Sequence, residues 1–176
     1  MDAVVQDTRT ITDAQWRYYC EYFAGFILGI GQIHSPENRE RVVVTVKGYG
    51  GNFVTLISPF ARVSPKAYIG EGTIVMPGAC VNAGAKIGDF VILNTGCIVE
   101  HDAEVYGFSH ISTGAVINGD CVVGPRCFIG SNAVLLNQII VRKETTVGAG
   151  SVVTKNIEDE NSIYVGNPAT FVRKKT

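Results

Sequence analysis

The sequence lacks several features that would place it in a familiar class. Its longest hydrophobic run, residues 22–31, falls well short of the roughly 20 residues that a membrane-spanning helix requires. Its N-terminus, MDAVVQDTRT, is acidic and polar, unlike a signal peptide. The formal net charge is −1, and no basic patch large enough for a nucleic-acid backbone stands out. These absences favour a soluble cytoplasmic protein without a membrane or nucleic-acid partner.

Cysteine pairs and metal-ligand clusters are also missing. The five cysteines form no C-x-x-C pair, and an odd number without framework spacing argues against a secreted disulfide scaffold. A zinc site of three converging histidines would need every histidine in the chain. One of them, His34, lies outside the repeat described below and is interpreted as a turn residue. We therefore expect no metal cofactor.

What the sequence does contain is an unbroken repeat of six residues. From Ile57 to Val153 every sixth residue is Val, Ile or Leu, which makes 17 consecutive matches. The residue two places before each aliphatic is usually small; Val91 is slightly larger and Ile139 is the clear exception. The small positions include three cysteines, which we expect to be buried packing residues: Cys97, Cys121 and Cys127.

A period of six is typical of the hexapeptide repeat of a parallel β-helix. Three hexads close one triangular coil, with the aliphatic side chain pointing inward and the small residue near a corner. Seventeen hexads predict an all-β domain of five to six coils over residues 57–156, joined by backbone hydrogen bonds between coils. Because the repeat never breaks, no long loop should leave the prism.

The N-terminal segment lacks the repeat. We interpret residues 1–56 as a small, truncated α/β region in which FILGIG, residues 26–31, forms a buried strand. Ser35 and Pro36 suit the N-cap and the first position of a helix. The run VVVTV, residues 42–46, prefers a strand, so helix and strand both remain open there.

The C-terminal segment, residues 157–176, begins with a polar exit from the repeat. A β-helix must cover its open end, so we expect residues 163–171 to form a cap. The cap is followed by a short basic tail, Arg173, Lys174 and Lys175.

The segment VEHDAEVYGFSHISTGA, with LNTGCIVEHD overlapping it and GNPA near the C-terminus, resembles the hexapeptide acetyltransferases that modify sugars. The closest similarity is to the sialic acid O-acetyltransferase-like group, which includes enzymes that N-acetylate the 4-amino group of UDP-linked amino sugars. The resemblance covers roughly residues 22–176. It implies a left-handed β-helix and acetyl-CoA-dependent transfer to an amino or hydroxyl group of a sugar, expected to be nucleotide-linked.

His101 is the candidate general base. An amine or hydroxyl that attacks the acetyl-CoA thioester must lose a proton, which a neutral imidazole accepts readily near pH 7. His101 lies two residues after the inward-pointing Val99, so it should project outward near a corner. Either Glu100 or Asp102 could hold its tautomer and stabilise the imidazolium. The resemblance implies that the following acid, here Asp102, is the partner.

The resemblance also implies roles for other residues. Gly119 matches a glycine whose backbone N–H stabilises the charge that develops on the thioester oxygen. Asn94 matches a polar residue that faces the sugar, and His110 matches a histidine that contacts substrate or acetyl-CoA. Coenzyme A would lie in a groove between C-terminal coils of neighbouring chains, with three candidate contacts: Ser131, Ala149 and Gly150. The basic tail either reaches the 3′-phosphate or is simply solvated.

The spacing of the two histidines bears on assembly. His101 and His110 are nine residues apart, half of an 18-residue coil, so they should face different sides of the prism. They can line one pocket only if another subunit supplies one of them. We therefore hypothesise an active site between the subunits of a homotrimer, which the flat prism faces favour.

The N-terminal segment departs from this family. The related enzymes carry a full α/β domain with a glycine-rich loop for the nucleotide, and no such loop precedes FILGIG here. Three functions therefore remain open: acetyl transfer to a sugar, acetyl transfer to another small acceptor such as an amino acid, and a catalytically inactive β-helical scaffold. The intact His101, Asp102 and Gly119 argue against the scaffold, and the shortened N-terminus argues for it.

Overall fold

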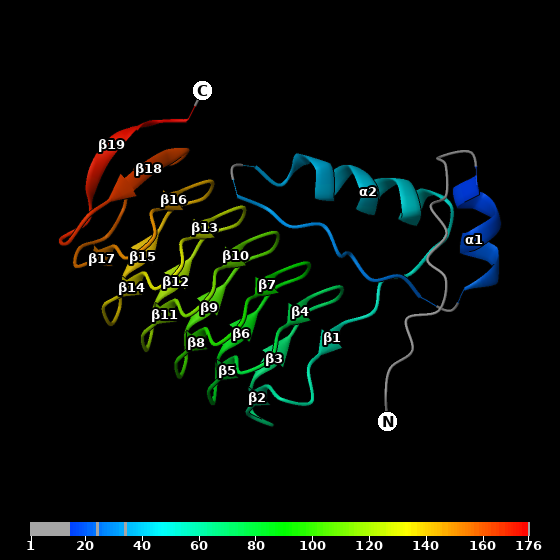
Figure 1. The fold of residues 1–176 in the computed structure, drawn as a ribbon, viewed down its shortest axis with the longest axis horizontal. Helices are drawn as coiled ribbons and strands as arrows, with labels where there is room; N and C mark the ends of the chain where they lie inside the picture. Colours follow the sequence, from blue (N-terminus) through cyan, green and yellow to red (C-terminus); the bar gives the residue numbers. More distant parts are fainter. Residues whose placement is uncertain (1–14, 24, 34, 176) are drawn as a thin grey trace.

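Short strands wind around a triangular prism in the computed structural model, which describes residues 15–23, 25–33 and 35–175 (Figure 1). Each hexad contributes one strand of two residues: Leu56–Ile57 (β1), Arg62–Val63 (β2), Tyr68–Ile69 (β3), Ile74–Val75 (β4), Cys80–Val81 (β5), Lys86–Ile87 (β6), Ile92–Leu93 (β7), Ile98–Val99 (β8), Glu104–Val105 (β9), His110–Ile111 (β10), Val116–Ile117 (β11), Val122–Val123 (β12), Phe128–Ile129 (β13), Val134–Leu135 (β14), Ile140–Val141 (β15), Thr146–Val147 (β16) and Val152–Val153 (β17).

Each strand pairs in parallel with the strand three places later in the chain, so the strands of the prism form three sheets. Sheet 1 contains β1, β4, β7, β10, β13 and β16; sheet 2 contains β2, β5, β8, β11, β14 and β17; sheet 3 contains β3, β6, β9, β12 and β15. Each residue lies opposite the one 18 positions later, as Ile98 does with Val116 and Val116 with Val134. The 18-residue coil and the predicted five to six coils are therefore confirmed.

The side chains inside the prism follow the repeat. From Val75 onward the aliphatic residue of each hexad is at most 2% exposed, whereas Ile57 in the first coil is 44% exposed because no coil precedes it. Cys97, Cys121 and Cys127 are fully buried, which confirms their predicted packing role. Burial raises the pKa of Cys97 and of Cys127 to about 12, so both remain thiols at neutral pH.

The N-terminal region is helical over residues 42–46, where the sequence left helix and strand open. Its described residues form two helices, α1 (Trp16–Tyr22) and α2 (Glu37–Gly48), and the second includes the valine run that favoured a strand. The helix prevails there because Val43 and Val46, three residues apart, both enter a small core with Leu28 and Phe53. Neither helix is long and apolar enough to cross a membrane, within the residues described.

Two expectations for this region were wrong. Residues 26–31 are extended but not a buried strand, since their only bridge joins Phe26 to Phe53 and Leu28 is the one buried residue among them. Pro36, rather than Ser35, occupies the N-cap of α2, although Oγ of Ser35 still accepts from the backbone N–H of Glu37 at 3.4 Å. The interpretation of His34 as a turn residue lies outside the described residues.

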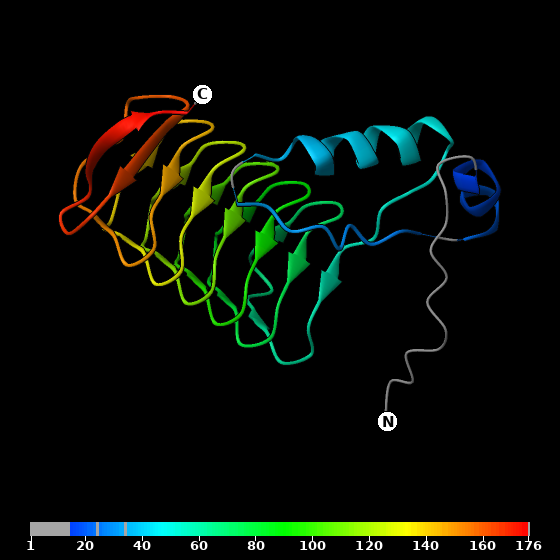
Figure 2. The same cartoon turned by 45° about the horizontal axis from the view of Figure 1, so that its top comes forward.

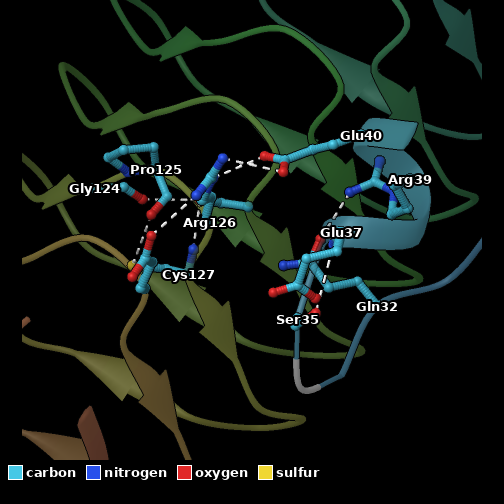
Figure 3. A network of polar contacts seen from close by, with 11 residues as sticks. Gln32, Ser35, Glu37, Arg39, Glu40, Gly124, Pro125, Arg126 and Cys127 are labelled. Carbon is cyan, nitrogen blue, oxygen red and sulfur yellow. Dashed lines mark hydrogen bonds and ion pairs between the residues drawn. The ribbon is translucent and has the colours of Figure 1, made fainter. Parts of the chain in front are cut away.

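Helix α2 runs along the corner where sheet 3 leads into sheet 1 (Figures 1 and 2). Arg126 of that corner donates to both carboxylate oxygens of Glu40 at 2.7 and 3.0 Å, and to Glu144 of the next coil at 3.1 Å (Figure 3). At the other end of the helix, Lys47 pairs with Glu71 at 2.7 Å. These contacts hold α2 and the preceding residues 25–33 against the outer face of the prism.

The C-terminal segment closes the fold. Strand β18 (Ser162–Val165) continues sheet 1 in parallel beside β16, and β19 (Thr170–Lys174) pairs with it in antiparallel fashion. Tyr164 and Ala169 pack against the interior of the prism. This hairpin lies at the C-terminal end of the β-helix, where the cap was expected (Figure 2).

Replacing an inward aliphatic should destabilise the whole prism. Ile117 is fully buried between coils, so Ile117→Ala leaves a cavity, and we expect the free energy of unfolding to fall by about 2–5 kcal/mol. Urea denaturation measures this change. Thr154→Ala, at an exposed corner, should change it by less than about 0.5 kcal/mol. Equal losses in the two variants would contradict the assignment of the core.

Candidate active site

His101 lies on the corner where sheet 2 leads into sheet 3, directly after β8. Its side chain is 56% exposed, and its Nδ1 lies 3.0 Å from Oδ2 of Asp102. Because a carboxylate only accepts, Nδ1 carries the proton and Nε2 of the neutral ring is left to accept one. The hydrogen bond to Asp102 is the main cause that raises the pKa of His101 above its ordinary value.

The structure distinguishes between the two acids that flank His101. Glu100 accepts a hydrogen bond from Nδ2 of Asn82, one coil earlier, at 2.8 Å. Asp102 has a φ of 59°, and in this left-handed conformation its carboxylate meets the neighbouring imidazole. Asp102, not Glu100, is therefore the residue that orients His101.

Gly119 lies one coil above His101, because the two residues are 18 positions apart. A Cβ built on Gly119 would lie only 2.7 Å from Cε1 and from Nε2 of the imidazole. The ring of His101 thus rests against the backbone of Gly119, and a side chain at this position would displace the ring. The predicted trio of His101, Asp102 and Gly119 is brought together within one chain.

Asn94 and His110 also lie together, but on a different part of the prism. His110 is the outward residue of β10 in sheet 1, and Asn94 is at the corner where sheet 1 leads into sheet 2. Nδ2 of Asn94 is 3.1 Å from Nε2 of His110. The two line a cavity of about 160 Å³ whose other walls are residues 28–31 and the apolar side chains Ile74, Met76 and Ile92.

The three candidate coenzyme A contacts follow Asn94 along the same corner. Ser131 lies 3.0 Å, Oγ to Oγ, from Ser112, and its carbonyl oxygen accepts from the backbone N–H of Gly150 at 2.8 Å. Ala149 and Gly150, in the next coil, are exposed. This corner therefore has an accessible backbone beside the Asn94–His110 cavity.

The candidate residues thus form two groups, separated within one chain by sheet 2. His101 and His110 lie on different sides of the prism, as their spacing predicted. The outward residues of sheet 2 between the two groups are aliphatic and half-buried: Ile98, Val116, Val134 and Val152. A single chain does not form one pocket from both groups.

Sequence reasoning missed two residues behind His110. The backbone oxygen of Gln32 accepts from Nδ1 of His110 at 2.7 Å, and the side chain of Gln32 accepts from Arg39 at 2.9 Å. These partners are separated by 78 and 7 residues, and no motif in the repeat signals them.

Among the described residues, no group of three or more His, Cys, Asp or Glu side chains could hold a metal ion.

Comparison with known proteins decides the family. A profile described as bacterial transferase hexapeptide (six repeats) matches residues 120–155. The acetyltransferase domain of PglB from Neisseria gonorrhoeae is 36% identical, with a TM-score of 0.76 over 80% of this chain and 68% of that one. The chain belongs to the hexapeptide-repeat acetyltransferases. No curated protein sequence matches it.

Other members of this family agree. A perosamine N-acetyltransferase from Caulobacter crescentus, solved with CoA and GDP-perosamine, is 30% identical, with a TM-score of 0.83 over 91% of this chain and 75% of that one. WeeI from Acinetobacter baumannii is 26% identical, with a TM-score of 0.64 over 80% and 68%. The suspected family and the left-handed β-helix are confirmed, and this hexapeptide-repeat protein is an acyltransferase.

The hydrogen bond between His101 and Asp102 can be tested by titration. Asp102→Asn removes the charged acceptor that chiefly raises the pKa of His101, so that pKa should fall below the wild-type value. An NMR pH titration of the imidazole protons measures it. Glu100→Gln is the matched control and should have a smaller effect, because Glu100 bonds to Asn82 instead. An unchanged pKa in Asp102→Asn would show that the pair does not form.

Proposed function

We propose that this acyltransferase moves the acetyl group of acetyl-CoA to an amino or hydroxyl group of a sugar, with a nucleotide-linked amino sugar as the acceptor. The observation that carries the proposal is the His101–Asp102 pair resting against the backbone of Gly119. Relatives with the same fold support it, since the PglB domain was solved with acetyl coenzyme A and the perosamine enzyme with CoA and GDP-perosamine.

The proposed reaction is a direct attack on the thioester. The acceptor nitrogen forms a bond to the carbonyl carbon while Nε2 of His101 takes its proton. The N–H of Gly119 stabilises the negative charge on the oxygen of the tetrahedral intermediate. As the C–S bond breaks, the imidazolium returns the proton to the departing sulfur, which gives free CoA thiol and an acetamide.

Asp102 makes His101 a better base in this scheme. It keeps the proton on Nδ1 and stabilises the imidazolium that forms during attack. The raised pKa of His101 strengthens Nε2 as a base. The amine is the preferred nucleophile, because the perosamine relative is an N-acetyltransferase.

Acetyl-CoA would lie along the corner that contains Ser131, Ala149 and Gly150, where exposed backbone can accept the amides of pantetheine. Of the basic tail, Lys174 is already paired with Asp159 at 3.2 Å. Arg173 is exposed and is the better candidate for a phosphate contact.

The complete site would form between subunits of a homotrimer. His101, Asp102 and Gly119 of one chain would face Asn94, His110 and the coenzyme A corner of its neighbour. The half-buried aliphatic side chains of sheet 2 suit such packing, because they would otherwise remain in partial contact with water.

Loss of the general base should abolish turnover. We expect His101→Ala to lower the rate of CoA thiol release by about 10²-fold or more, measured with acetyl-CoA against a panel of nucleotide-linked amino sugars. Lys86→Ala, an exposed change on sheet 3, is the control and should retain the wild-type rate. Saturable acetyl-CoA binding without turnover of any sugar would point to another acceptor. Absence of both binding and turnover would favour the scaffold.

Mixing of inactive subunits tests the shared site. Random co-assembly of His101→Ala and His110→Ala chains should restore activity at about a quarter of the sites, where an intact His101 faces an intact His110 of its neighbour. Each variant alone should stay weak. No recovery from mixed trimers, together with a normal trimer mass in ultracentrifugation, would show that the two histidines do not share a site across subunits.

A further inference from the structure

Behind the Asn94–His110 cavity, the proposed acceptor pocket, a series of hydrogen bonds runs from helix α2 to Asn94. Arg39 donates through Nη1 to Oε1 of Gln32 at 2.9 Å (Figure 3). Through Nη2 it donates to the carbonyl oxygen of Phe90 at 2.6 Å. The carbonyl oxygen of Gln32 accepts from Nδ1 of His110, and Nε2 of His110 lies 3.1 Å from Nδ2 of Asn94.

The donor and the acceptor can be assigned for each hydrogen bond in this series. A carbonyl oxygen only accepts, so Nδ1 of His110 carries the ring proton and Nε2 of the neutral ring must accept. Oδ1 of Asn94 is occupied by the backbone N–H of Thr95 at 2.7 Å, which turns the amide nitrogen toward His110. Asn94 therefore gives one N–H to His110 and retains a second.

The supporting residues are almost completely buried. Arg39 is 1% exposed, Gln32 is 4% exposed, and Nε of Arg39 has no hydrogen-bond partner among the described residues. Desolvation lowers the pKa of Arg39 to about 10, so it remains charged at neutral pH. Burying a charge with an unsatisfied donor is unfavourable. The salt bridges of Arg126 and Lys47, by contrast, dock α2 at the surface without contacting Gln32.

We propose that Gln32 and Arg39 are positioning residues: the main-chain carbonyl of Gln32 fixes His110 in one tautomer, and Arg39, through the side chain of Gln32, holds that carbonyl in place. Asn94 then presents an N–H donor to the pocket and selects an acceptor substrate with an oxygen at that point. A sugar hydroxyl or a carbonyl oxygen has the required chemistry. Phe128 packs edge-on against the ring of His110, with 5.2 Å between centroids, and limits its rotation. The inference about the oxygen of the acceptor rests on the proposed function, whereas the inference about the tautomer of His110 does not depend on it.

Kinetics test the effect on substrate binding. In Gln32→Leu and Arg39→Met the side-chain link is lost, and we expect KM for the sugar acceptor to rise about five- to ten-fold with kcat within about two-fold of wild type. Gln32→Glu keeps an acceptor for Arg39 and should restore a KM near the wild-type value. Arg126→Met loosens α2 without touching Gln32 and is the matched control. An equal rise of KM in Arg126→Met would mean that helix docking explains the effect.

A spectroscopic measurement tests the tautomer without turnover. Long-range ¹H–¹⁵N NMR of the three histidines in the ligand-free protein should show His110 with a protonated Nδ1 and an unprotonated Nε2. Gln32→Leu and Arg39→Met should give a mixture of tautomers, and Arg126→Met should not. A wild-type His110 protonated on Nε2 would overturn the proposal. The expected tautomer in a protein that acetylates no sugar would instead count against the proposed function alone.

Discussion

The parallel hydrogen-bonded ladder between coils is the interaction on which the rest of the structure depends. Because each coil has 18 residues, every side chain has a vertical neighbour 18 positions away. This places His101 against Gly119, as it places Glu144 beside Arg126. The candidate active site is therefore a local consequence of coil length: one coil provides the imidazole and the next provides the backbone against which it rests.

The corners of the prism supply a left-handed backbone conformation that the flat sheets do not contain. At a corner the chain turns through the left-handed region, and Asp102 adopts this conformation although it is not glycine. Such a backbone conformation costs about 1–2 kcal/mol, and the same turn brings the carboxylate to the imidazole. On sheet 1, residues 28–32 lie beside the outward-facing His110, and burial lowers the pKa of its imidazole below the ordinary value. His101 is thus exposed and its pKa is raised, whereas His110 is buried and its pKa is lowered.

Local and periodic features were accessible from the sequence, and distant contacts were not. The six-residue period predicts all the strands from β1 to β17, because each hexad carries its own inward aliphatic. Adjacency left both Glu100 and Asp102 as partners for His101, and the family resemblance indicated Asp102, which the structure pairs with it. The valine run in α2 misleads because burial of Val43 and Val46 outweighs β propensity. The hydrogen bond between His110 and Gln32 joins residues 78 positions apart in the sequence, and the bond between Arg39 and Phe90 joins residues 51 positions apart. Only the three-dimensional structure reveals these contacts.

We propose that the general base and the Asn94–His110 pocket of one active site come from different chains. A crystal structure of the assembled protein with bound CoA is the decisive measurement. The CoA sulfur should lie between Nε2 of His101 in one subunit and the Asn94–His110 pocket of its neighbour, with the N–H of Gly119 beside it. A sulfur bound next to His101 and remote from any second chain would show that a single chain forms the site.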